Sequence, residues 1–355
     1  MTEFTLALPF ALPPAEMAPH LVRALQAPAL ATLLSRHSTA QYRSLDHSRV
    51  LPHEAWLARA LGLTTAGAAG TAPLAVACMR GCALPAQSTA DASRGHWFIL
   101  QPAHIQVSST HPSLADPRAL CLDDDKARAL YDAARPYFEE LGKTLLYGAP
   151  DLWFLRADDW AQLSTASPDS VINQNLGDWL PEGACARDYR RLQNEIQMLW
   201  HQHPVNAARE ARGLPAVNSY WCWAGAEAGV PASATTATAA GFAVSGGPTW
   251  MEVLATPALR QTSIDQLLAR PGATTVMAAE LIPAGQASEW AEWIAMVQQI
   301  DRLWCAPLLA ALMDGRIGRV NLVLSHREGT LEVASTRLAQ RKFWRKTNLN
   351  LLNSH

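Results

Sequence analysis

The sequence lacks the features that would assign it at once to a membrane-spanning, secreted or nucleic-acid-coating protein. No stretch approaches the ~20 uninterrupted apolar residues that a membrane-spanning helix needs. Lys and Arg number 29 against 31 Asp and Glu, so no basic excess would attract nucleic acid to the chain as a whole. The apolar start, residues 4–12, follows Glu3 and precedes two prolines, which predicts a first strand instead of a secretory signal. We therefore expect a soluble cytoplasmic protein without a membrane partner.

Cysteine is scarce and irregularly placed. Only Cys78 and Cys82 are close together, and no second Cys or His pair stands near them to complete a tetrahedral zinc site. Scattered cysteines in a long chain do not indicate a disulfide framework. We expect six free thiols: Cys78, Cys82, Cys121, Cys185, Cys222 and Cys305.

Common catalytic fingerprints are also missing. The sequence contains no P-loop, no G-x-S-x-G elbow and no dinucleotide-binding glycine motif. The acidic run 123–125 is what capping and the helix dipole favour at a helix start. His201 and His203 are two residues apart, so a helix would point them to different faces, where they cannot chelate one ion. The residues thus predict neither a metal nor a cofactor.

What the chain does contain is enough apolar material for a large core. Of its residues 49% are hydrophobic, and 13 are tryptophans, which we expect to anchor the core or an interface. Apolar spacing predicts helices over residues 27–34, 53–61, 123–141 (kinked or split at Pro136), 186–203 and 288–312 (capped by Ser288). It predicts strands over residues 97–100, 104–107, 144–147, 153–155, 242–244, 274–277, 320–324 and 330–333.

The order of these elements indicates two structural parts. Strands alternate with helices at both ends of the chain, whereas the middle reads β-β-α-β-β. This order is typical of an α/β sheet core with a small inserted α+β lobe. We expect the core to comprise residues 1–94 and 200–355, and the lobe residues 95–199.

A basic segment near the end allows two interpretations. Residues 337–346 carry five Lys or Arg side chains around Phe343 and Trp344. They could contact phosphate or nucleic acid through charge and stacking. Alternatively, they form an amphipathic final helix whose two aromatic rings dock on the body. We prefer the second interpretation, because five charges without a wider basic field form a weak footprint, and we do not expect a nucleic-acid partner.

The most informative segment is residues 203–225, which gathers polar side chains in a loop and short helix. Asn206 and Arg209 are three residues apart, so a helical turn would point them the same way. Arg209 offers a planar fork of donors to a carboxylate or phosphate, and Asn218 can donate and accept. Composition alone favours a structural interpretation, in which these groups cap helix ends and tie a loop to a strand.

The spacing in this segment resembles a known family. The pattern H-P-V-N-x-x-R-x-x-x-G-L-P-x-x-N-x-x-W-x-W-x-G is similar to a segment of the archaeal-type cofactor-independent phosphoglycerate mutases and their bacterial relatives, members of the alkaline-phosphatase-like superfamily. Residues 27–34, 300–303 and 320–326 show a weaker similarity to other segments of the same family. Within the group, the chain looks most similar to a bacterial branch of RpfE-type regulatory proteins. The resemblance implies an alkaline-phosphatase-like sheet core flanked by helices, with the inserted lobe.

The departures from the family pattern concern the chemistry. Two-metal phosphoryl transfer needs clustered carboxylates and histidines beside a nucleophile. The family's first strand ends in Asp-Gly, but residues 7–14 here contain no acid, and an early family Asp is replaced by Ala31. Residues 281–287 lack the family's Asp-x-x-x-His, and its Asp-His pair becomes Ser325-His326. The resemblance therefore implies a fold kept after the metal chemistry was lost.

We accordingly expect a non-catalytic, regulatory protein that binds an unknown protein partner or a small anionic ligand. One alternative is a metal-independent enzyme acting on a phosphorylated or carboxylated small molecule. A second is a nucleic-acid-associated regulator that uses the basic tail. No residue is assigned to catalysis or to a metal. The candidate ligand contacts are His203, Asn206, Arg209, Asn218, Trp221, Trp223 and His326.

Overall fold

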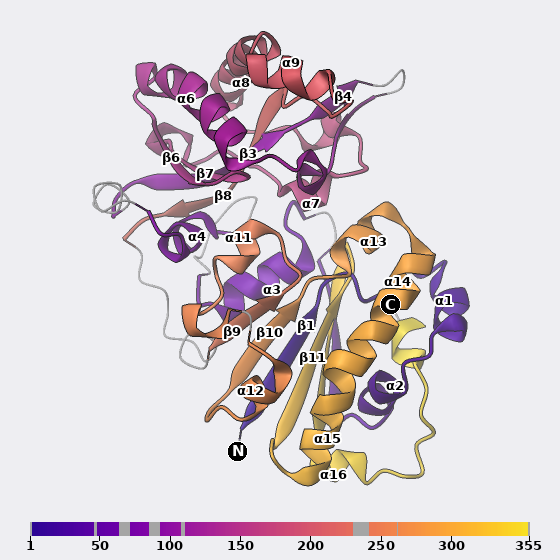
Figure 1. The fold of residues 1–355 in the computed structure, drawn as a ribbon. Helices are drawn as coiled ribbons and strands as arrows, with labels where there is room; N and C mark the ends of the chain where they lie inside the picture. Colours follow the sequence, from indigo (N-terminus) through magenta and orange to yellow (C-terminus); the bar gives the residue numbers. More distant parts are fainter. Residues whose placement is uncertain are drawn as a thin grey trace. The chain divides into compact units, whose positions relative to one another are not determined.

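The computed structural model describes residues 2–45, 48–63, 72–84, 93–107, 111–229, 241–260 and 262–353. It divides into two units (Figure 1), each treated by itself below: unit 1 comprises Met1–Gly62 and Ala234–His355, and unit 2 comprises Leu63–Ser233. Residues 63–94 and 200–233 therefore group with the inserted part, although we expected them in the core. The reason for the second difference is a strand near residue 220 that pairs within unit 2.

Unit 1 is built on a six-stranded mixed sheet of order β2-β12-β11-β1-β10-β9 (Figure 1). The four strands β11, β1, β10 and β9 are mutually parallel; β12 pairs antiparallel with β11, and β2 pairs antiparallel with β12. Parallel strands are covered on both faces and read as continuous apolar runs, and every residue of β10 is buried. The bounds are β1 Glu3–Leu8, β2 Thr39–Ser44, β9 Phe242–Ser245, β10 Thr274–Ala278, β11 Arg319–Ser325 and β12 Gly329–Thr336.

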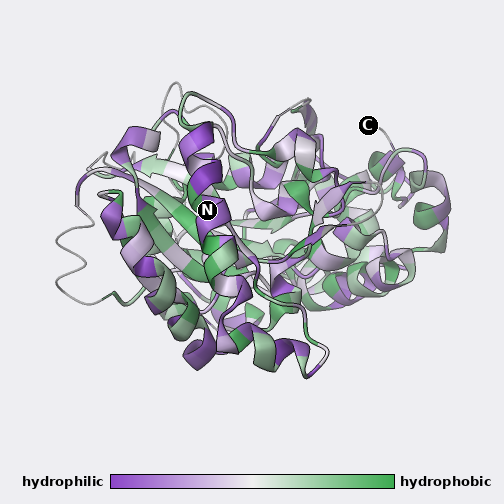
Figure 2. Cartoon of the chain, turned by 90° about the horizontal axis from the view of Figure 1, so that it is seen from above, coloured by the Kyte–Doolittle hydropathy of each residue, from purple (hydrophilic) through white to green (hydrophobic). Residues whose placement is uncertain are grey.

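The helices of unit 1 flank this sheet (Figure 1), and together they form the α/β class that the sequence predicted. In Figure 2 the strands are mainly hydrophobic, whereas the helices alternate in hydropathy, as amphipathic helices do. The bounds are α1 Ala18–Ala24, α2 Pro28–Ser35, α3 Pro52–Ala60, α11 Thr249–Glu252, α12 Ile264–Leu268, α13 Ile282–Ala287, α14 Trp290–Ile300, α15 Ala306–Asp314 and α16 Arg337–Gln340.

The helix expected over residues 288–312 differs in detail. Ser288 has a left-handed backbone and ends α13 instead of capping the start of a new helix. Between α14 and α15 the chain forms a π-helical turn, Asp301–Cys305. Pro307 follows this turn, and its missing N–H cannot donate to the carbonyl four residues earlier, which favours a wider turn at this point.

The end of unit 1 corrects another expectation. Helix α16 has only four residues, and the segment after it is not helical until Asn350. Phe343 is 82% exposed and Trp344 69% exposed. The prediction that both rings dock on the body is therefore wrong, because the chain leaves the helical path before it could bury them.

Unit 2 has a four-stranded antiparallel sheet of order β6-β7-β3-β8 and a two-stranded sheet, β4-β5. The predicted β-β-α-β-β order is present with one further short strand before the helix, and β8 joins it from later in the chain. The strand bounds are β3 His96–Ala103, β4 Ile105–Val107, β5 Pro112–Leu114, β6 Thr144–Ala149, β7 Leu152–Arg156 and β8 Ser219–Glu227. The helix bounds are α4 Ala75–Gly81, α6 Asp124–Glu140, α7 Pro168–Val171, α8 Ala186–His201 and α9 Pro204–Glu210.

Helix α6 begins as predicted, because the Asp123 side chain accepts a hydrogen bond from the Lys126 backbone N–H. Pro136 does not split it. Pro136 is exposed, so water can reach the carbonyl that its missing N–H leaves unpaired.

The core of unit 2 is aromatic. Trp153, Trp160 and Trp200 are completely buried with Tyr189 and Tyr220. Trp153 packs edge-on against Trp200 with ring centroids 6.0 Å apart, and the Trp200 indole donates to the Leu130 carbonyl. These tryptophans are core anchors, as expected from their size and single donor.

All six cysteines are free thiols, as predicted. Among the described helices, none is long and apolar enough to cross a membrane.

Candidate functional site

The segment 203–225 lies in unit 2, where Asn206 acts as a clamp between two parts of the chain. Its amide nitrogen donates to the carbonyls of Trp200 and Val217, both at 2.8 Å, and its amide oxygen accepts from the Val217 N–H at 2.7 Å. The residue is 1% exposed. Three of the four bonds that an asparagine side chain can make are thus directed at backbone groups.

Arg209 is used in a similar way. It is 2% exposed, its Nε donates to the Pro215 carbonyl at 2.8 Å, and its terminal nitrogen donates to the Leu120 carbonyl at 2.6 Å. Asn218 accepts from the Ile105 N–H and donates to the Ile105 carbonyl, which extends the pairing at the edge of β4. Both side chains join segments about 90 to 113 residues apart in the chain.

The remaining candidates of unit 2 also have protein partners. The Trp221 indole donates to the Ala166 carbonyl at 2.7 Å, and the Trp223 indole donates to the Gln101 side chain at 2.8 Å. His203 caps α9 by accepting the Val205 N–H at its Nδ1, and burial lowers the pKa of this imidazole. These bonds agree with the structural interpretation from composition. A ligand-binding role for the six residues stays a prediction.

The seventh candidate, His326, lies in unit 1, at the carboxyl edge of the parallel strands. In open α/β sheets, ligands bind in the crevice outside this edge. The residues at the ends of the four parallel strands lie at this edge. They are Pro9 and Phe10 after β1, Ser245 and Gly246 at the end of β9, Glu280 after β10, and Ser325 and His326 at the end of β11. We therefore treat this edge as the candidate functional site.

Phe10 follows β1, the strand that lies between β11 and β10 at this edge. It is 5% exposed and has a left-handed backbone with φ 58°. Its carbonyl accepts a hydrogen bond from the Trp293 indole at 2.8 Å. Gly285 lies so close that an added Cβ would be 2.7 Å from the Phe10 Cβ. The ring contacts His53, with ring centroids 5.7 Å apart. An apolar, anchored residue therefore stands two positions after β1, in a stretch that contains no acid.

On one side of Phe10, Glu280 bonds to Ser245. The Ser245 hydroxyl donates to one Glu280 carboxylate oxygen, and the other oxygen has no partner among the described residues. Burial raises the pKa of Glu280, and the serine bond opposes that rise. Gly246 permits this arrangement, because an added Cβ would lie 2.4 Å from the Glu280 Cγ.

On the other side lie Ser325 and His326. The Ser325 hydroxyl is 1% exposed and lacks a hydrogen-bond partner in the described structure. His326 Nε2 is 2.9 Å from the Tyr42 hydroxyl, and the two rings are stacked at 8°. Its Nδ1 accepts the Glu328 N–H, so a neutral His326 carries its proton on Nε2 and donates it to Tyr42.

This geometry defines what the edge can do. Strand β1 separates β10 from β11, so the backbones that carry Glu280 and His326 are about two strand spacings, ~10 Å, apart. Two-metal catalysis holds its ions only about 4 Å apart, which requires ligands that converge. Phe10 follows β1, the strand between them, and its ring packs against His53. The edge can hydrogen-bond a ligand through Glu280, Ser325 or His326, but these strand ends do not gather a set of acids around one point.

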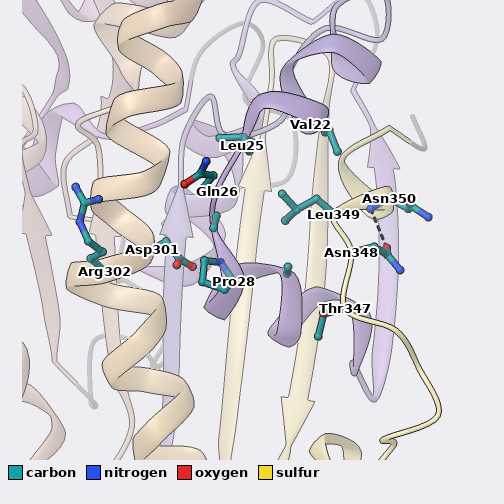
Figure 3. Close-up of a pocket in the computed structure, with 12 residues that line it drawn as sticks. Val22, Leu25, Gln26, Pro28, Asp301, Arg302, Thr347, Asn348, Leu349 and Asn350 are labelled. Atoms are coloured by element: carbon teal, nitrogen blue, oxygen red, sulfur yellow. Dashed lines mark hydrogen bonds between the residues drawn. The ribbon is translucent and has the colours of Figure 1, made fainter.

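A hollow of unit 1 lies beside α2, apart from the sheet edge (Figure 3). It is an open depression of about 730 Å³, lined by residues of α1, α2, the π-helical turn and the segment 347–350. Asp301 points toward Pro28 (Figure 3), and its carboxylate accepts the Leu30 N–H at 2.6 Å. Ala31 also lines this hollow.

Asp301 caps the first turn of α2, and the sequence pattern did not predict this role. Burial raises the pKa of its carboxyl, and the bonds from the first turn of α2 oppose that rise. An acid inside the apolar stretch 290–312 is the one feature of the sequence that indicates a buried hydrogen-bonding role. Its partner lies 271 residues away, which no local pattern indicates.

We expect the stability contribution of Glu280 to depend on pH. Because its pKa is raised in the folded protein, the folded state holds this proton more tightly than the unfolded chain does. The contribution is therefore present at low pH and lost as the pH rises through the folded pKa. Glu280→Gln should match the wild type near pH 4 and become progressively more stable than it toward pH 8, measured by urea unfolding. The exposed control Glu252→Gln should show no such trend, and parallel curves for Glu280→Gln would refute the burial argument.

Comparisons with known proteins concern the fold alone. No model of a protein family matches the chain, and no curated protein matches it in sequence. Similar solved structures include the PH0037 protein from Pyrococcus horikoshii, with a TM-score of 0.56 and 10% identity over 94% of this chain and 87% of that one. A cofactor-independent phosphoglycerate mutase from Thermoplasma acidophilum has a TM-score of 0.45 and 12% identity over 100% of this chain and 95% of that one, a likeness too weak to carry an argument. The architecture is a helix-flanked mixed sheet, which is the α/β class predicted from the sequence, and the alkaline-phosphatase-like assignment stays a prediction.

Proposed function

We propose that this chain is a phosphoglycerate-mutase-like protein of the RpfE-type branch that does not catalyse phosphoryl transfer and that regulates by binding a protein partner or a small anionic ligand. The observation that carries the proposal is Phe10. An anchored, buried aromatic ring stands at the end of β1, where the resembling family places a metal-binding acid. A side chain without lone pairs cannot bind a metal, and its bulk fills space that ions would need.

The side chains around Phe10 support the proposal. Glu280 is bonded to Ser245, and His326 is bonded to Tyr42 and to the Glu328 backbone. Each is oriented by protein partners on its own side of β1. Such groups suit recognition of a ligand better than the concerted attack and charge stabilisation of phosphoryl transfer, which need a nucleophile beside the metals.

The test is a metal analysis combined with activity assays on purified protein. We expect less than one tenth of an equivalent of Mn²⁺ or Zn²⁺ after incubation and desalting, and no phosphatase or phosphoglycerate mutase turnover above that of buffer. An active archaeal-type mutase, measured in parallel, serves as the positive control. Stoichiometric metal together with turnover that falls on Glu280→Gln or His326→Gln would overturn the proposal.

The alternative of a metal-independent enzyme at residues 203–225 gains no specific support. It requires Arg209 and Asn206 to face a substrate, whereas both direct their donors at backbone carbonyls within unit 2. The other alternative, a nucleic-acid-associated regulator, depends on the basic tail, which is a different surface.

A further inference from the structure

Three large apolar side chains are exposed within seven residues near the end of unit 1. Leu338 is 73% exposed, Phe343 82% and Trp344 69%, and the two aromatic rings form a T-shaped pair with centroids 5.3 Å apart. We call these three residues, together with the exposed cations Arg341 and Lys346, the tail patch. Single exposed apolar residues are normal on protein surfaces, but several in close sequence indicate a contact surface.

The backbone that presents the tail patch is fixed to the body of unit 1. The Lys342 ammonium donates to the His37 carbonyl at 2.9 Å, and Arg345 donates to the Ser35 carbonyl at 3.2 Å. The Asn348 N–H donates to the Ser35 hydroxyl at 2.8 Å. Carbonyls at the end of a helix such as α2 attract cations. The rings are thus exposed on an anchored segment, which lowers the ordering cost of binding.

The charge around the tail patch is mainly positive. Residues 337–355 contain five Lys or Arg and no Asp or Glu, and α2 contains no acid. The acids on the other two elements beside α16 already have cationic neighbours. Glu332 of β12 lies 3.9 Å from Arg43, and Asp314 of α15 lies 3.8 Å from Arg316. A binding partner therefore meets positive charge, although the whole chain has a net charge of −2.

We propose that the tail patch binds the surface of an anionic lipid bilayer. Trp and Phe favour the boundary between headgroups and acyl chains, and clustered Lys and Arg attract acidic headgroups. Leu338 favours lipid over single-stranded nucleic acid, because bases stack on aromatic rings but gain little from an aliphatic side chain. Peripheral binding needs no membrane-spanning helix, and the proposal departs from our expectation that the protein has no membrane partner. The proposal concerns a surface separate from the sheet edge and is independent of the proposed function.

The experiment is co-sedimentation of the full chain with vesicles. Phosphatidylcholine vesicles are compared with vesicles in which about a third of the lipid is phosphatidylserine. We expect binding to the anionic vesicles that weakens strongly at 1 M salt, where the Debye length falls to about 3 Å. Binding to phosphatidylcholine alone should be at least tenfold weaker. Acrylamide should quench Trp344 less in the bound state, and Trp344→Phe identifies this contribution among the other tryptophans.

Variants of the tail patch make the test specific, and its side chains are exposed enough for the fold to tolerate them. Arg341→Gln combined with Lys346→Gln should weaken binding roughly 25-fold, at about fivefold per cation. Phe343→Ser with Trp344→Ser, and separately Leu338→Ser, should also weaken it. Matched controls in unit 2 should have no effect: Arg187→Gln with Arg190→Gln for charge, and Met198→Ser, at 72% exposure, for an apolar side chain.

Several outcomes would overturn the proposal. These are no binding to anionic vesicles, equal binding to both vesicle types, and equal loss of binding in the unit 2 controls. Tight binding to a single-stranded oligonucleotide that ignores Leu338→Ser, without vesicle binding, would assign the patch to nucleic acid instead. None of these results depends on whether the protein binds a metal or turns over a substrate, so this proposal and the proposed function fail separately.

Discussion

Asn206→Asp is expected to lower the free energy of unfolding of unit 2 by about 3–5 kcal/mol, or to prevent its folding. The native amide nitrogen donates to the carbonyls of Trp200 and Val217 in a buried position. A carboxylate has the same shape but cannot donate, so it leaves the Val217 carbonyl without its donor and the Trp200 carbonyl with backbone donors alone, and it places a negative charge against both. Each unpaired buried acceptor costs about 1–3 kcal/mol, and a buried charge adds more. Urea unfolding followed by tryptophan fluorescence measures the effect, since the aromatic core of unit 2 reports on this transition.

Two further variants show how much of the loss of stability comes from the missing donors and how much from the added charge. Asn206→Ala removes the same donors without adding charge, so its cost should be smaller, about 2–3 kcal/mol. Glu210→Ala, at an exposed position of the same helix, should change stability by less than about 0.5 kcal/mol. If Asn206→Asp unfolds at the same urea concentration as the wild type, the clamp does not contribute as its hydrogen bonds indicate.

Arg209→Ala is expected to destabilise unit 2 by about 2–4 kcal/mol. Its guanidinium links the Pro215 loop to the Leu120 carbonyl, which belongs to a segment 89 residues earlier. Truncation leaves two carbonyls without donors and removes a large buried side chain. Arg209→Lys should recover only part of the loss, because one ammonium cannot reproduce the planar fork. The measurement is the thermal or urea midpoint of the purified variants.

This variant also separates two interpretations of residues 203–225. A purely ligand-binding Arg209 would leave the midpoint unchanged and abolish binding or turnover. A structural Arg209 lowers the midpoint in the absence of any ligand. The exposed Arg212→Ala is the matched control, and it should behave as the wild type does. An unchanged midpoint for Arg209→Ala would therefore contradict the structural assignment and revive the enzyme alternative.

Periodicity predicted the elements whose burial is regular. Strand β10 and the buried residues of α8 are examples, because a continuous or repeating apolar pattern follows directly from which faces are covered. Strand β2 was missed because five of its six residues are exposed, so it has no apolar pattern. The tail was misjudged for the opposite reason: its aromatic residues suggested burial, but the backbone departs from helix before the rings meet the body.

The candidate site shows a similar division. The absence of an acid after the first strand was readable, because residue type at a strand end is local information. The sequence did not indicate that Phe10 adopts a left-handed backbone or that it contacts Gly285 and His53. These contacts join distant parts of the chain, so no local pattern encodes them. The sequence also did not indicate which groups accept the hydrogen bonds of Asn206 and Arg209. A backbone carbonyl carries no sequence signal, so a ligand-binding and a structural arginine look alike in sequence.

The topology of unit 1 also sets the order in which the protein can be completed during synthesis. Strand β1 is hydrogen-bonded on one side to β10 and on the other to β11, and the first turn of α2 is capped by Asp301. All three partners are translated about 270 residues or more after the residues they contact. At about 5–20 residues per second, an apolar first strand waits tens of seconds for its neighbours. Unit 2 lies wholly within that interval, so the nascent chain has all of it available to fold while the opening strand still depends on other protection from aggregation.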